Sequence, residues 1–155
     1  MIKNSLTSLL VIFIFLLGYV REMIFLVINS VYHKAPPPYN TAYITPPEFL
    51  YQLTTSTLIN LKWGFTLLFS IFFGLSTLLL IHYFFRNKQF NIITIIVYTV
   101  LIFISFLISL IGILFNSFET LYTISRFIVG LVQSPLISLV LFVLFYFKTE
   151  NQNYI

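Results

Sequence analysis

The apolar residues of this chain fall into four long runs separated by short polar segments. The runs cover about residues 5–31, 61–85, 90–115 and 121–147. A helix of about 20 residues crosses the hydrocarbon core of a bilayer, so each run is long enough to span one. Only helices and closed barrels satisfy their backbone groups in lipid, and these runs do not alternate as barrel strands do. The pattern predicts an all-α membrane protein, a single-domain bundle of four transmembrane helices.

The composition supports lipid as the solvent for most of the chain. Of its 155 residues, 59% are hydrophobic, 19% are aromatic and only 8% are charged, whereas soluble domains contain about 25% charged residues. The first run, preceded by Lys3, also has the charge and length of a cleaved signal peptide. Small residues of the Ala-x-Ala kind do not follow it, and apolar residues resume after Glu22, which favours a retained helix.

The basic residues predict the orientation in the membrane. Lys3, Arg86, Lys88 and Lys148 lie at helix ends that four crossings place on one side, and that side is expected to be the cytoplasm. Both termini are then cytoplasmic, and residues 32–60 and 116–120 lie outside. The net charge of +4 comes from basic residues scattered singly along the chain. This distribution is typical of residues that set the orientation in the membrane, and it predicts no nucleic-acid partner.

The long outer segment predicts a short helix on the membrane surface. Three consecutive prolines, 36–38, favour an extended backbone. In Thr45-Pro46-Pro47-Glu48, Thr45 is the expected cap, Pro46 the first helical residue and Glu48 the reciprocal capping residue. The helix is predicted over about 46–55, and a flexible linker is the alternative. We interpret five residues as an extracytoplasmic partner surface or as a cover for polar groups beneath it: Thr45, Glu48, Phe49, Leu50 and Leu53.

Small and polar residues recur at helical spacing inside the apolar runs. They allow close helix packing, within the chain or with a partner: Ser70, Gly74 and Thr77; Ser105, Ser109, Gly112 and Asn116; Arg126, Gly130, Gln133 or Ser134, and Ser138. Within the last run, Pro135 lacks an amide proton and frees the Leu131 carbonyl. A helix kink is predicted there.

Charged residues inside the apolar runs mark the candidate site. Charges in a bilayer are costly and face the bundle interior or one another. Arg21 and Arg126 are predicted at similar depth below the outer surface, with Glu22 as the counter-ion of Arg126. The cluster is either a buried pair that sets helix register or an outward-opening pocket for an anionic group or a partner helix. Its predicted members are Arg21, Glu22, Arg126, Glu119 and Asn29.

No pattern of catalytic residues is present in the sequence. There is no cysteine and no Gly-rich phosphate loop, and the four glutamates fall in different segments. His33 and His82 are predicted on opposite sides of the membrane and cannot share a metal ion. We therefore predict that the protein is not an enzyme and has no catalytic residue, cofactor or metal.

The end of the first run carries a family resemblance. It resembles the small membrane proteins associated with exosortases in the residues Gly18-Tyr19-Val20-Arg21-Glu22, Phe25 and Ile28-Asn29. The resemblance implies an accessory or scaffolding subunit of a bacterial inner-membrane complex that processes exported proteins. Another integral membrane protein is its expected partner besides the lipid bilayer, and self-association into a homo-oligomer is a further candidate. The resemblance does not imply that this chain is itself the transpeptidase of such a system, because exosortases use a cysteine and this sequence contains none.

A small proton-coupled secondary transporter is the alternative function. Four helices with one glutamate in the first are similar in size to the small multidrug transporters, and Glu22 would carry the proton. Arg21 beside that glutamate and the long outer segment argue against this interpretation.

Overall fold

A computed structural model describes residues 2–34, 45–115 and 118–152, which form six helices and no strands. The bounds are α1 Ile2–Tyr32, α2 Glu48–Tyr51, α3 Thr55–Phe85, α4 Lys88–Leu114, α5 Phe118–Val132 and α6 Pro135–Gln152. The proline run at 36–38 lies outside the described residues.

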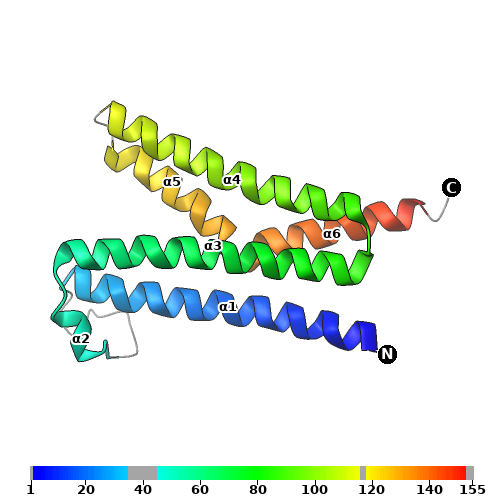
Figure 1. Ribbon diagram of the computed structural model, residues 1–155, viewed down its shortest axis with the longest axis horizontal. Coiled ribbons are helices and arrows are strands. Elements are labelled where there is room, and N and C mark those ends of the chain that lie inside the picture. Colours follow the sequence, from blue (N-terminus) through cyan, green and yellow to red (C-terminus); the bar gives the residue numbers. More distant parts are fainter. Residues whose placement is uncertain (1, 35–44, 116–117, 153–155) are drawn as a thin grey trace.

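The long helices run back and forth along one axis (Figure 1). α1 and α3 lie side by side and antiparallel, α4 returns beside α3, and α5 packs mainly on α4. α3 is central, because it contacts α1, α4, α5 and α6. We call the two ends of the bundle the α2 end and the opposite end. The α4–α5 pair diverges from α3 toward the α2 end, whereas α1 begins and α6 ends at the opposite end.

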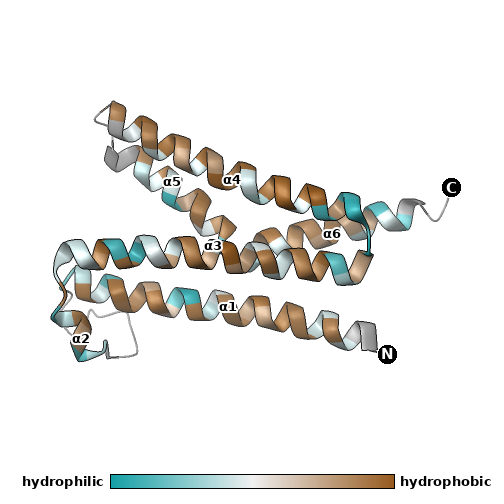
Figure 2. Ribbon diagram, in the orientation of Figure 1, coloured by the Kyte–Doolittle hydropathy of each residue, from teal (hydrophilic) through white to brown (hydrophobic). Residues whose placement is uncertain are grey.

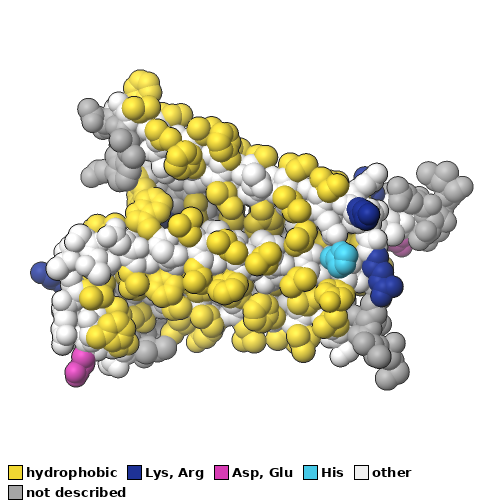
Figure 3. Space-filling view, viewed as in Figure 1, with side chains coloured by type: hydrophobic (Ala, Val, Ile, Leu, Met, Phe, Trp, Pro, Cys, Tyr) yellow, Lys and Arg dark blue, Asp and Glu magenta, His cyan; other side chains and the backbone are white. Residues whose placement is uncertain are grey.

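The apolar surface assigns the fold to the class of all-α membrane proteins. Three helices are long and apolar enough to span a bilayer, and the bent pair of α5 and α6 makes a fourth where it is counted as one span. Hydrophobic residues dominate the helix centres in Figure 2, and their side chains cover the face seen in Figure 3. Soluble monomers rarely expose continuous apolar surface of this extent. Three of the four predicted runs are thus single helices, and the fourth is the bent pair of α5 and α6.

The core consists of aromatic and branched side chains from several helices, and α3 contributes more of them than any other helix. Phe73, Leu80 and Ile81 are buried between the neighbouring helices. Toward the opposite end, Phe90 of α4 stacks on Phe145 of α6, with ring centroids 4.4 Å apart. Because lipid is as apolar as these side chains, their close packing, and not the hydrophobic effect, holds the helices together.

The predicted surface helix differs from the observed one. α2 is a single turn preceded by Pro47, and no side chain caps it, so the prediction that Thr45 caps a helix over 46–55 is wrong. Pro46 and Pro47 disfavour the helical conformation in the residue before each of them, which delays the helix start to Glu48. α3 then begins at Thr55, earlier than the predicted residue 61, because the Thr54 hydroxyl accepts a hydrogen bond from the Thr57 amide at 3.3 Å.

The kink predicted at Pro135 is a complete break. α5 and α6 meet at 57°, and Pro135 begins α6 at a position where the missing amide proton costs little. The freed Leu131 carbonyl accepts from the Ser134 hydroxyl at 2.7 Å and from the Ser134 amide at 3.1 Å. Residues of the break itself therefore supply the hydrogen-bond donors that the Leu131 carbonyl needs where α5 ends.

Close packing of α1 on the start of α6 can be tested at Gly18. A methyl group there would lie 3.2 Å from Cδ and Cγ of Pro135, so Gly18→Ala is expected to lower the free energy of unfolding by about 1 kcal/mol. Gly64→Ala is the matched control, since its methyl group meets no atom within 4 Å and alanine favours a helix. Unfolding of both variants in detergent micelles measures the difference. A Gly18→Ala variant as stable as Gly64→Ala would contradict this contact.

Candidate functional site

The side-chain amide of Gln133 connects three helices at the break between α5 and α6. Gln133 is only 2% exposed. Its Nε2 donates to the Thr66 carbonyl of α3 at 2.6 Å and to the Ser70 hydroxyl at 2.9 Å. Its Oε1 accepts from Arg21 Nε of α1 at 3.3 Å. We call Arg21, Thr66, Ser70 and Gln133 the polar junction.

The α3 side of the polar junction is built by helical spacing. Thr66 and Ser70 lie one turn apart, and the Ser70 hydroxyl donates to the Thr66 carbonyl at 2.8 Å. The Ser70 oxygen is then oriented to accept from Gln133. The Thr66 hydroxyl donates in turn to the Lys62 carbonyl at 2.8 Å. α3 therefore provides Gln133 with two acceptors, the Thr66 carbonyl and the Ser70 hydroxyl.

Arg21 reaches the polar junction from α1 and lies beside the last turn of α5. Its Nη2 would be 4.0 Å from a Cβ atom at Gly130, and its guanidinium lies 4.8 Å from the centroid of the Phe25 ring. Nη1 donates to Glu22 Oε2 at 2.9 Å. A positive charge near the carboxyl end of α5 complements the helix dipole, so Arg21 stabilises the broken end.

Glu22 pairs with Arg21 rather than with Arg126. The Glu22 side chain is 61% exposed, because adjacent helical residues point about 100° apart and only Arg21 faces α5. Among the described residues, Arg126 has no ion pair, and it is exposed. The predicted Glu22–Arg126 pair is therefore absent from the described part of the chain.

The other predicted members of the cluster do not extend the polar junction. Asn29 lies two turns from Arg21 along α1, and its Oδ1 is buried without a hydrogen-bond partner among the described side chains. The side chain of Glu119 lies outside the described residues. Of the predicted cluster, the structure joins only Arg21 and Glu22 directly.

The predicted partner surface is only partly exposed. Thr45, Glu48 and Phe49 are exposed, whereas Leu53 is half-buried. Leu50 is 5% exposed and packs in one cluster with Ile28, Val31 and Leu58. Leu50 thus anchors α2 to the ends of α1 and α3 and is not available to a partner.

Two further hydroxyl clusters join helices elsewhere. The Thr77 hydroxyl of α3 lies 2.8 Å from the Tyr98 hydroxyl of α4 and 2.5 Å from that of Ser138 of α6. Ser105 and Ser125 link α4 to α5 through hydroxyl oxygens 2.8 Å apart. The stripes of small residues in the sequence indicated packing at Thr77, Ser105 and Ser138, whereas Tyr98 carried no signal that separated it from the other aromatic residues.

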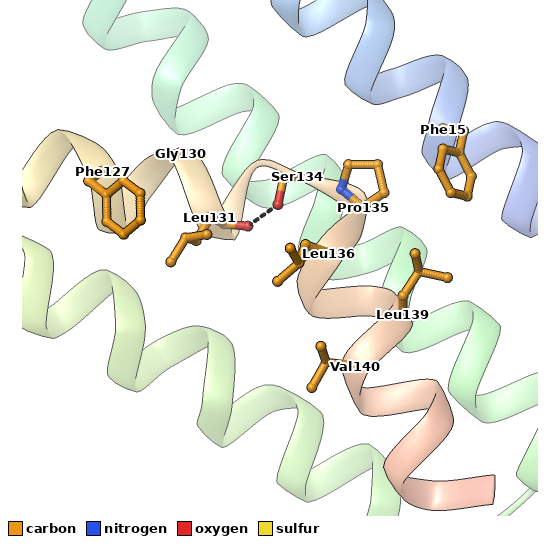
Figure 4. A pocket seen from close by; sticks show the side chains of 9 residues that line it. All are labelled: Phe15, Phe127, Gly130, Leu131, Ser134, Pro135, Leu136, Leu139 and Val140. Atoms are coloured by element: carbon orange, nitrogen blue, oxygen red, sulfur yellow. Dashed lines mark hydrogen bonds between the residues drawn. The ribbon is translucent and has the colours of Figure 1, made fainter.

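An apolar groove lies at the break and is lined by residues of α5, α6 and α1 (Figure 4). We call it the elbow groove, and its volume is about 580 Å³. Its lining is almost entirely apolar and consists of Phe15, Phe127, Gly130, Leu131, Ser134, Pro135, Leu136, Leu139 and Val140. The Ser134 hydroxyl points toward the Leu131 carbonyl and not into the groove (Figure 4). The elbow groove therefore presents a surface that is suited to an apolar occupant.

The described residues contain no group of three or more His, Cys, Asp or Glu side chains placed to hold a metal ion. Comparisons with protein-family models, curated proteins and solved structures found no match to this chain. Its function is therefore argued from the polar junction and the elbow groove.

The contribution of the polar junction can be measured at Gln133. Gln133→Leu removes three hydrogen bonds and leaves Arg21 Nε without its acceptor, so we expect a loss of about 1 to 2 kcal/mol in the free energy of unfolding. Gln89→Leu, at an exposed position of α4, is the control and should change stability by less than about 0.5 kcal/mol. A double-mutant cycle of Arg21→Leu with Gln133→Leu should show coupling of about 1 kcal/mol. Additive effects would contradict the bond between these side chains.

Proposed function

We propose that this protein is a non-enzymatic accessory or scaffolding subunit that binds a transmembrane helix of another integral membrane protein. The observation that carries the proposal is the elbow groove, an apolar concavity that opens sideways from a span long enough to cross the bilayer. A groove in this position faces lipid or a neighbouring membrane helix, rather than water.

The floor of the elbow groove supports a helix as the occupant. Gly130 and Ser134 are spaced by four residues, the small-xxx-small pattern that lets two helix backbones approach closely. Phe15 and Phe127 line the groove from α1 and α5. The contact of Gly18 with Pro135 and the polar junction at Gln133 hold the two half-helices at a fixed angle. A preformed groove binds more tightly because less conformational entropy is lost on association.

The partner and the setting follow from the resemblance at Gly18–Asn29, which favours a bacterial inner-membrane complex of the exosortase type. Both termini are proposed to be cytoplasmic, with α2 outside. α1 begins and α6 ends at the opposite end of the bundle, which supports an even number of crossings. Arg86 and Lys88 lie between α3 and α4 at the same end, as the positive-inside rule requires of a cytoplasmic side.

Site-specific photocrosslinking in the native membrane tests the proposal. A photoreactive residue in place of Leu139, within the elbow groove, should form an adduct with a different integral membrane protein. The same residue in place of Leu144 is the matched control, because Leu144 is exposed on α6 outside the groove. Adding Leu139→Trp to a chain with the photoreactive residue at Phe15 should reduce the adduct by about tenfold or more, as expected for an overfilled pocket. Adducts with a second copy of this chain alone, or equal adducts from both α6 positions, would contradict the proposal.

Flux measurements separate this proposal from the transporter. Glu22 already has a positive partner at 2.9 Å, and this argues against a carboxylate that exchanges protons during transport. Vesicles containing the purified chain are expected to show no substrate flux driven by a pH gradient. A flux that is present in the natural chain and lost in Glu22→Gln would establish the transporter instead.

A further inference from the structure

Two cations, Lys62 of α3 and Arg126 of α5, lie toward the α2 end with no carboxylate paired to them among the described residues. Arg126 precedes Gln133 by seven residues and therefore lies two turns away on the same face of α5. Lys62 precedes Thr66 by one turn on α3. Since Gln133 bonds to Thr66 at 2.6 Å, the two cations extend from facing positions of two helices in contact. The described residues place no carboxylate against either of them.

Both cations lie at similar distances from the starts of their helices. Arg126 is eight residues from the start of α5 and Lys62 is seven from the start of α3, which corresponds to about 12 and 10 Å of helix. Lys62 Nζ lies 5.1 Å from the centroid of Tyr32, the last residue of α1. The ammonium group therefore extends toward the α2 end, as lysine side chains do when they reach for the interface.

Two like charges in apolar surroundings require a counter-ion. Each is disfavoured in hydrocarbon, and their mutual repulsion adds to this. Arg21 does not contribute to the excess, because Glu22 balances its charge at 2.9 Å. Lys62 and Arg126 therefore carry a net positive charge that a bound anion would balance.

We propose that Lys62 and Arg126 together bind the phosphate of an anionic phospholipid in the leaflet at the α2 end. Arginine and lysine are the usual phosphate ligands, and anionic lipids are attracted by each basic residue at the membrane surface. This lipid site is distinct from the elbow groove, because neither Lys62 nor Arg126 lines that groove.

Quenching of tryptophan fluorescence by brominated lipids tests this proposal on the purified full chain. The single tryptophan, Trp63, adjoins Lys62 and is 49% exposed. Vesicles contain equal parts of phosphatidylglycerol and phosphatidylcholine, with bromine on the acyl chains of one lipid or the other. The ratio of quenching in the two kinds of vesicle reports which lipid lies beside Trp63, and intrinsic changes in fluorescence cancel in this ratio.

The natural chain should prefer brominated phosphatidylglycerol, and each single variant, Lys62→Gln or Arg126→Gln, should weaken its relative affinity by about fivefold. The double variant should show no preference, whereas Lys62→Arg should retain it. Arg86→Gln with Lys88→Gln, at the opposite end, is the control of equal charge change and should retain it too.

Three results would overturn the proposal. Equal quenching by both lipids in the natural chain would indicate that the two cations pair with an acidic residue of a partner helix and not with a lipid. An unchanged preference in the double variant would place the lipid elsewhere. Loss of the preference in excess inorganic phosphate would show that a free anion, and not the lipid, is the ligand.

Discussion

The hydrogen bonds of the Gln133 amide are the constraint on which the rest of the structure depends. A transmembrane helix that breaks in hydrocarbon exposes backbone groups that water cannot satisfy. Here Ser134 satisfies the Leu131 carbonyl locally. The Gln133 side chain donates hydrogen bonds to α3 and accepts one from α1. The break is therefore stable only because two neighbouring helices present matching polar groups at the same depth.

The two candidate binding sites arise from this one break. Where α5 turns into α6, residues of both helices and of α1 line the apolar elbow groove. The polar junction holds this turn against α3, and α5 diverges from α3 toward the α2 end (Figure 1). Arg126 and Lys62 lie on α5 and α3 on that side of the junction. A continuous fourth helix would not form the elbow groove.

Local signals predicted the elements, and long-range contacts decided the site. The apolar runs indicated the spans because each must match the thickness of the bilayer, and Pro135 marked the break because it removes an amide donor. Glu22 was assigned to Arg126 from depth and because Arg21 points about 100° away around the helix. The long arginine side chain nevertheless reaches Glu22 at 2.9 Å. The prediction at Thr45 failed because capping residues and consecutive prolines compete, and the prolines delayed the helix start. Gln133 and Ser134 were equal candidates in the sequence, and only packing distinguished their partners.

The class of protein follows from hydrophobicity, which acts residue by residue and needs no tertiary contacts to be recognised. The apolar runs, the position of the break and the polar residues buried in those runs were therefore predictable from the chain itself. The bonds of Gln133 were not, since its partners lie 112 and 67 residues away in the sequence. Which polar groups meet inside the membrane depends on helix rotation and crossing angle, and those are set by packing among helices that are distant in the chain.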